Sequence, residues 1–206
     1  MRIFTPQHQI NVEQIHQIPL YPTGCESVST VMALRYLGKD ITVDEFIDQW
    51  LPLGAEPHVG NEGSVVGCDP WKAFPGDPYS DSGWGCFPPV IATALSASGM
   101  AEEYTVEILA GQSIESLCAS CVSQDIPVVF WATSGMEEGK EVECWRVEEG
   151  EKMIHWIAPM HCLLLVGYDE ENYYFNDPQV GKAVPYAKNR VRSAYETMGK
   201  QALVIY

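Results

Sequence analysis

The sequence predicts an α+β fold, with a helical side that comes first and an antiparallel sheet that follows it. Helix patterns dominate residues 23–123, and short apolar runs bounded by turn residues dominate residues 126–206. No internal repeat or change of composition separates the two sides, so we expect a single domain over residues 1–206. A chain of this length, with 46% apolar residues, can bury a sizeable core.

The first predicted helix begins beside a cysteine. Thr23 and Glu26 have the spacing of a capping box, and an apolar run from Val28 leads to Gly38, which can end the helix in a left-handed conformation. Cys25 then lies in the first helical turn, where unpaired N–H groups and the helix dipole favour a thiolate. Cys25 is therefore a candidate nucleophile, and a buried core thiol is the alternative.

Further helices are predicted after Thr42, which begins a second capping box, after Pro88 and after Ser113. Residues 51–89 have no such pattern, because glycine and proline recur there among aromatic residues. So many aromatic residues favour ordered loops that form the wall of a cleft, and the alternative is a disordered linker.

The sheet is predicted from a series of apolar runs, of which residues 160–168 form the strongest strand. The other predicted strands are residues 104–109, 127–133, 173–176 and 202–206, and the glutamate-rich residues 137–152 are expected to form a solvated hairpin or loop. His161 begins the strongest strand, and Asp177 follows the next strand across a tight turn. Antiparallel pairing places these two side chains close together.

The stretch from Gly24 to Gly38, followed by the His161 strand and by Asp177, resembles a known family. It is similar to the papain-like peptidases related to the bacteriocin-processing enzymes that cleave after double-glycine leaders, and most of all to stand-alone bacterial proteins of that kind. The similarity also covers residues 74–79, 88–89 and 126–131, and therefore nearly the whole chain. His161 follows Cys25 by 136 residues, within the interval typical of papain. The resemblance implies a papain-like cysteine proteinase fold.

The resemblance also implies a role for each site residue, without a metal or another cofactor. Cys25 would be the nucleophile, His161 the general base and acid, and Asp177 the group that orients the imidazole. Gln17 best matches the glutamine that stabilises the oxyanion, although it lies eight residues before Cys25, further than in the transporter-linked relatives. Gly24 stands where those relatives have an acidic residue.

Each of these residues also has a simpler explanation. His161 can be a structural histidine, Asp177 a turn residue before Pro178, and Gln17 a polar surface residue. Cys118 and Cys121 are spaced like a redox pair, but packing of small apolar residues is the better explanation.

The complete set of catalytic residues predicts a cysteine peptidase that acts on peptides through a thioester acyl-enzyme. The alternatives are a non-catalytic peptide-binding module on the same fold, an acyltransferase, and a thiol-dependent metal or redox protein.

The charge of the chain limits its partners. With 28 acidic and 12 basic residues the net charge is −16, which argues against nucleic acids and anionic membranes. The excess of acidic residues either keeps the protein soluble or favours basic substrates. The acidic residues expected on the cleft wall are Glu56, Glu62, Asp69, Asp77 and Asp81.

The cellular location is predicted from two sequence patterns, a membrane-spanning run and a signal peptide. We find no membrane-spanning run and no signal peptide, so a cytoplasmic protein is expected, or an extracytoplasmic one if the sequence is a mature fragment. Seven cysteines leave at least one outside any internal disulfide, and the oligomeric state has no signal in the sequence.

Overall fold

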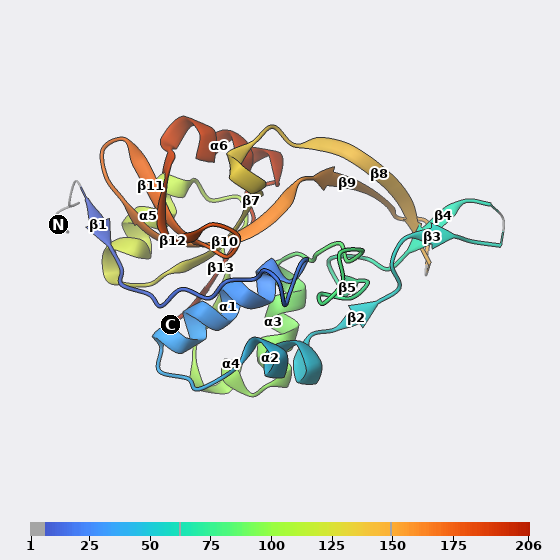
Figure 1. Ribbon diagram of the computed structural model, residues 1–206, viewed down its shortest axis with the longest axis horizontal. Coiled ribbons are helices and arrows are strands. Elements are labelled where there is room, and N and C mark those ends of the chain that lie inside the picture. The colour runs from blue at the N-terminus through green and yellow to red at the C-terminus, as the bar shows by residue number, and fades with distance from the viewer. Residues whose placement is uncertain (1–6, 62, 149) are drawn as a thin grey trace.

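The computed structural model describes residues 7–61, 63–148 and 150–206. Helices occupy the first part of the chain after a two-residue strand, as the sequence predicts (Figure 1). These elements are β1 (His8–Gln9), α1 (Cys25–Tyr36), α2 (Val43–Trp50), α3 (Pro88–Ala97), α4 (Met100–Glu103) and α5 (Ile114–Ser120).

The main sheet is antiparallel and has seven strands within the described residues. Its order is β12-β11-β10-β7-β13-β6, and β1 also pairs with β10. The strands are β6 (Val106–Ile108), β7 (Val128–Thr133), β10 (Met160–Tyr168), β11 (Asn172–Asp177), β12 (Gly181–Ala187) and β13 (Ala202–Ile205). The predicted strands are all present, and the predicted hairpin joins β10 to β11.

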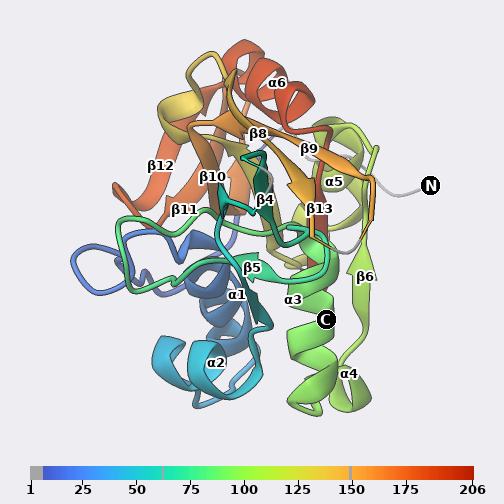
Figure 2. The same ribbon diagram turned by 90° about the vertical axis from the view of Figure 1, so that its right-hand side faces the viewer.

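Helices cover both faces of this sheet (Figures 1 and 2). Successive side chains of a strand point to opposite faces. The ring of Phe130 on β7 stacks on Tyr195 of α6 (Lys188–Thr197), with the ring centroids 4.2 Å apart. The next residue, Trp131, donates its indole N–H to the carbonyl of Cys86 on the helical side, at 2.7 Å. The core therefore lies on both faces of β7, and α1 packs against β10 and β7 from the helical side.

A second sheet forms an arm beside the main body, at the right of Figure 1. The predicted glutamate-rich hairpin is its largest part, β8 (Lys140–Val147) and β9 (Met153–Ala158). It pairs with short strands of the loop region, β3 (His58–Val59) and β4 (Val65–Gly67), and β2 (Leu53–Gly54) pairs separately with β5 (Phe74–Pro75). Residues 51–89 are therefore held by strand pairing within their described part.

The predicted capping box of α1 is wrong. The helix begins at Cys25 after Gly24, and no side chain caps it. Thr23 instead donates its hydroxyl to the carbonyls of Asp77 and Ser80, and Glu26 is buried. Contacts with the loop that follows β5 thus replace the local cap. The second predicted capping box, Thr42 with Glu45, is present at α2, and Gly38 has the predicted positive φ of 88°.

The strand β12 and the helix α6 have no counterpart in the sequence prediction. In α6 only Val191, Ala194 and Tyr195 are buried, and no side chain caps its first turn. In β12 a proline interrupts the strand pattern. Both elements depend on packing against the sheet rather than on a local signal.

Candidate active site

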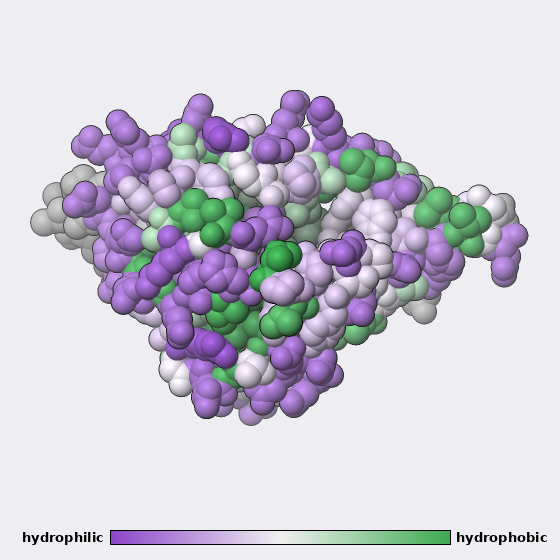
Figure 3. Space-filling model, in the orientation of Figure 1, coloured by the Kyte–Doolittle hydropathy of each residue, from purple (hydrophilic) through white to green (hydrophobic). Residues whose placement is uncertain are grey.

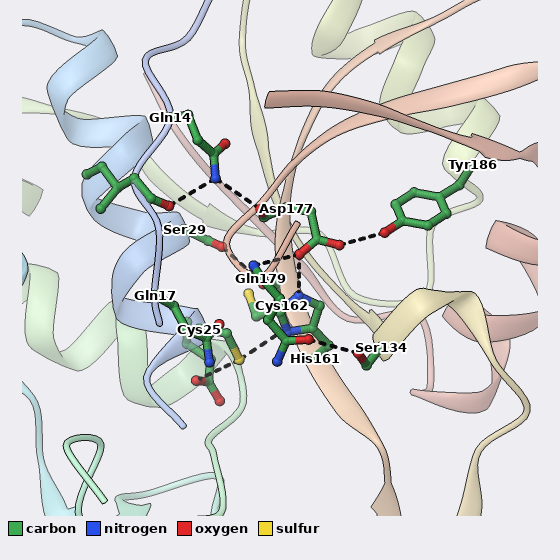
Figure 4. A network of polar contacts seen from close by, with 12 residues as sticks. Gln14, Gln17, Cys25, Ser29, Ser134, His161, Cys162, Asp177, Gln179 and Tyr186 are labelled. Carbon is green, nitrogen blue, oxygen red and sulfur yellow. Dashed lines mark hydrogen bonds and ion pairs between the residues drawn. The ribbon is translucent and has the colours of Figure 1, made fainter. Parts of the chain in front are cut away.

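Cys25 is the first residue of α1, and its side chain is only 4% exposed. Its Sγ accepts a hydrogen bond from the backbone N–H of Cys162 at 3.3 Å. Cys162 directly follows His161 on β10, so this contact joins the start of the helix to the strand that carries the histidine (Figure 4). On its other side, Sγ lies 3.4 Å from Oε2 of Glu26.

His161 is completely buried and is held by Asp177. Its Nε2 lies 2.9 Å from Oδ1 of Asp177, so the two residues are neighbours, as strand pairing predicts. Nδ1 is buried and has no hydrogen-bond partner within residues 7–61, 63–148 and 150–206. The nitrogen that remains available for a thiol is therefore Nδ1.

Asp177 accepts several further hydrogen bonds. Figure 4 shows it between His161 and Tyr186, whose hydroxyl donates to Oδ2 at 2.6 Å. The backbone N–H of Gln179 donates to Oδ1 at 2.9 Å. Burial raises the pKa of Asp177, but the hydrogen bonds from His161, Tyr186 and Gln179 outweigh it, so the pKa lies below its ordinary value. Asp177 is thus both a turn residue and the ionised partner of the imidazole.

The pKa of Cys25 differs from the sequence expectation. Burial raises it well above the ordinary value, and the nearby Glu26 raises it further. The hydrogen bond from Cys162 acts in the opposite direction but is the smaller effect. The resting side chain is therefore a thiol, despite its position at a helix N-terminus.

Gln17 lies next to this site and is 1% exposed, so the alternative that it is a surface residue is wrong. Its Nε2 donates to the carbonyl of Pro22 at 2.7 Å, and its backbone N–H donates to the carbonyl of Pro178 at 2.9 Å. Figure 4 shows Gln17 close to Cys25. Gln14, the other glutamine in this segment, donates Nε2 to the carbonyl of Asp177 at 2.9 Å. Hydrogen bonds to Pro22 before α1 and to Asp177 and Pro178 at the end of β11 therefore hold residues 14–17 in place.

Sequence reasoning missed two side chains of this site. Tyr186 belongs to β12, which has no signal in the sequence, and its place follows only from pairing opposite Tyr173 on β11. The sequence pattern predicts a capping role for Glu26, whereas its buried carboxyl lies against Cys25. A carboxyl directly after a candidate nucleophile was the available signal.

A groove of about 530 Å³ lies between the loop region and the β8–β9 arm, and Figure 3 shows the molecule hollowed near the base of the arm. Its walls include Trp84 from the loop region and Trp156 from β9, whose rings lie edge to face at 5.7 Å. The groove also includes Ala158, three residues before His161. Trp84 precedes Gly85, whose Cβ would lie 2.7 Å from Oε1 of Glu26, so the loop region reaches the residue that follows Cys25.

Two of the acidic residues expected on this wall line the groove, Glu56 and Asp81. Asp69 is buried and binds Lys152, and Asp77 accepts the backbone N–H of Tyr79. Glu62 lies outside the described residues. Two of the four described acidic residues of this wall therefore line the groove.

Other cysteines lie apart from this arrangement. Cys118 and Cys121 at the end of α5 are buried and free, and burial raises the pKa of Cys118 to about 12. This environment favours packing over redox chemistry. Among the described residues, one group with metal-ligating atoms within 4.8 Å of one another lies on the β8–β9 arm, Glu141, Cys144 and His155, and two of its three members are exposed.

Comparison with known proteins places the chain in a family. Residues 7–203 match the model of the Peptidase_C39 like family. The uncharacterized protein YvpB of Bacillus subtilis is 27% identical over 188 residues, which are 91% of this chain and 70% of that protein. The crystal structure of a candidate C39-like peptidase from Bacillus anthracis is similar with a TM-score of 0.78 and 25% identity, over 98% of each chain.

A more distant structure shows the same fold. A prointerpain A fragment from Prevotella intermedia matches with a TM-score of 0.50 and 11% identity, over 98% of this chain and 72% of that one. The chain therefore belongs to the Peptidase_C39 like family and has the papain-like cysteine proteinase fold. Over the described residues, every helix is too short or too polar to cross a membrane.

Proposed function

We propose that this protein is a cysteine peptidase in which Cys25, His161 and Asp177 cleave peptide bonds through a thioester. The observation that carries the proposal is the buried imidazole, which has Nε2 on Asp177 and Nδ1 without a partner in the described chain. The sulfur of Cys25 accepts a hydrogen bond from the backbone N–H of Cys162, the residue after this histidine. This arrangement supports the roles of nucleophile, base and orienting acid that we propose for Cys25, His161 and Asp177.

The first step forms the acyl-enzyme. Nδ1 of His161 takes the thiol proton as Sγ of Cys25 attacks the carbonyl carbon of the substrate. The backbone N–H of Cys25, which has no intrahelical partner, and the amide of Gln17 would stabilise the oxyanion. The imidazolium then protonates the leaving amine, and Asp177 keeps the ring oriented throughout.

The second step restores the enzyme. His161 takes a proton from the water that attacks the thioester, and it returns this proton to the sulfur of Cys25 as the C–S bond breaks and the carboxylic acid forms. An amine in place of this water would make the protein an acyltransferase. The site combines Cys25 of the helical side with His161 and Asp177 of the sheet side, which supports a single domain over residues 1–206.

A labelling experiment tests the proposal. A peptide carrying a thiol-reactive acyloxymethyl ketone is incubated with the protein at neutral pH, and modified residues are identified by mass spectrometry. We expect rapid labelling of Cys25 alone among the seven cysteines. Cleavage of a mixed peptide library is followed in parallel, with and without an amine acceptor. Peptide binding without labelling or cleavage would instead indicate a binding module.

We predict that Tyr186→Phe lowers kcat/KM by about 3–10-fold. The variant removes the hydroxyl that donates to Oδ2 of Asp177, so the carboxylate holds His161 less well. Tyr174→Phe is the matched control, because Tyr174 donates to Asp169 at the same distance of 2.6 Å but outside the site. Equal losses in both variants would contradict a role for Tyr186.

We predict that the enzyme prefers basic or neutral peptides to acidic ones. Glu56 and Asp81 line the groove together with the rings of Trp84 and Trp156, which favours cationic side chains. In a peptide series that differs only in lysine, glutamine or glutamate, kcat/KM should be about 3–10-fold higher for lysine than for glutamate at low salt. Asp81→Asn should reduce this ratio, whereas Glu102→Gln on α4 should leave it unchanged. A preference for the glutamate peptide would refute the prediction.

A further inference from the structure

Glu26 is a buried carboxyl group in direct contact with the proposed nucleophile. Glu26 is 1% exposed, and its Oε2 lies 3.4 Å from Sγ of Cys25. Oε1 accepts the backbone N–H of Cys86 at 2.6 Å. These contacts leave the carboxyl fixed beside the sulfur rather than turned to solvent.

The surroundings of Glu26 contain no compensating cation within the described part of the chain. The titratable groups that face it are the thiols of Cys25 on α1, Cys86 before α3 and Cys162 on β10. Burial raises the pKa of each of these thiols well above its ordinary value, so all three are neutral near pH 7. Burial likewise raises the pKa of Glu26 to about 7, although the N–H of Cys86 opposes the effect.

We propose that Glu26 is a further catalytic residue, whose carboxyl must be protonated for Cys25 to form a thiolate. This inference rests on the proposed function and extends it to the control of the nucleophile. A carboxylate 3.4 Å from the sulfur repels a thiolate, whereas the neutral acid does not and can donate its proton in a hydrogen bond to the sulfur.

The proton balance explains the direction of the effect. With Glu26 protonated, the S–H bond of Cys25 breaks and the N–H bond forms at Nδ1 of His161, which gives a thiolate and an imidazolium with no net charge. With Glu26 ionised, the same transfer would leave two neighbouring anions and one cation. The pair then reverts to a thiol and a neutral imidazole, and the negative charge stays on Glu26.

The pH dependence follows from this balance. An ordinary cysteine becomes more reactive as the pH rises, because more of it is ionised. Here Glu26 loses its proton as the pH rises through about 7, and the reactivity of Cys25 should fall. Replacing Glu26 with glutamine keeps the shape of the neutral acid and removes the titration.

Alkylation of Cys25 by iodoacetamide measures this reactivity without any substrate. Rates are taken from pH 5.5 to 9 by mass spectrometry of the peptide that contains Cys25. In the wild type we expect the rate to fall about tenfold between pH 6 and 8.5. Glu26→Gln should abolish this fall and react about tenfold faster than the wild type at pH 8.5.

Glu115→Gln is the matched control, because Glu115 is a half-exposed carboxyl that binds Arg192 on another face. Its alkylation profile should match that of the wild type. Parallel profiles for Glu26→Gln and the wild type would overturn the inference.

A second measurement serves if Glu26→Gln does not fold. In wild-type protein labelled with ¹³C at the glutamate side-chain carboxyl, one glutamate resonance should titrate near pH 7. If every glutamate titrates near the ordinary value of about 4.3, the inference is overturned. Peptide cleavage is measured separately. A protein that shows the expected alkylation profile but cleaves no peptide would refute the proposed peptidase and leave the control of Cys25 by Glu26 intact.

Discussion

Replacing Cys25 with alanine is expected to lower peptide cleavage by about three orders of magnitude or more while the protein remains folded. The variant removes the sulfur that the proposed mechanism uses to form the thioester. The removed atom is small, and its hydrogen-bond partners are the N–H of Cys162 and the carboxyl of Glu26, so the variant should remain folded. Steady-state kinetics on a cleavable peptide measure the loss, and circular dichroism confirms the fold.

Cys118→Ala is the control for this variant, because Cys118 is also a buried and free cysteine but lies on α5. It should retain its activity within a few-fold. Cys25→Ala with activity close to that of the wild type would remove Cys25 from the mechanism. Loss of activity in Cys118→Ala alone would instead favour the redox alternative.

His161→Ala is expected to reduce kcat/KM by about three orders of magnitude, and Asp177→Asn by about 10–100-fold. The alanine variant has no group to take the thiol proton. The asparagine variant can still orient the ring if its amide oxygen, rather than its nitrogen, faces the imidazole.

The surroundings of Asp177 select that orientation. The N–H of Gln179 donates to the same oxygen that binds His161, so an amide NH₂ in this position would face a donor. If the NH₂ of the introduced asparagine instead takes the place of Oδ2, it can donate to the hydroxyl oxygen of Tyr186, which can accept as well as donate. The imidazole therefore keeps an acceptor for Nε2–H and the correct tautomer.

Asp177→Ala provides the comparison, because it removes both oxygens. Its loss should exceed that of Asp177→Asn and leave the buried imidazole without an orienting partner. A larger loss for Asp177→Asn than for His161→Ala would show that Asp177 does more than orient the ring.

Local patterns in the sequence predict the order of most elements and the contact between His161 and Asp177, although β12 and α6 have no such pattern. The β10–β11 hairpin brings His161 to Asp177 by local pairing, so their contact required only strand patterns and a short turn. Cys25 lies in the first turn of α1 as predicted, although the capping box that predicted this start is absent. Local regularities of this kind are properties of neighbouring residues, and no knowledge of the rest of the fold is needed to find them.

The environment of these groups depends on contacts between distant parts of the chain. The capping pattern assigned Glu26 to its own helix end, but the loop at Cys86 and the sheet at Cys162 enclose its carboxyl beside the sulfur. The burial that results raises the pKa of both Cys25 and Glu26, whereas the helix N-terminus alone favours a thiolate. Desolvation depends on every segment packed around a group, and here those segments are up to 137 residues apart in the sequence, so no local pattern could predict it.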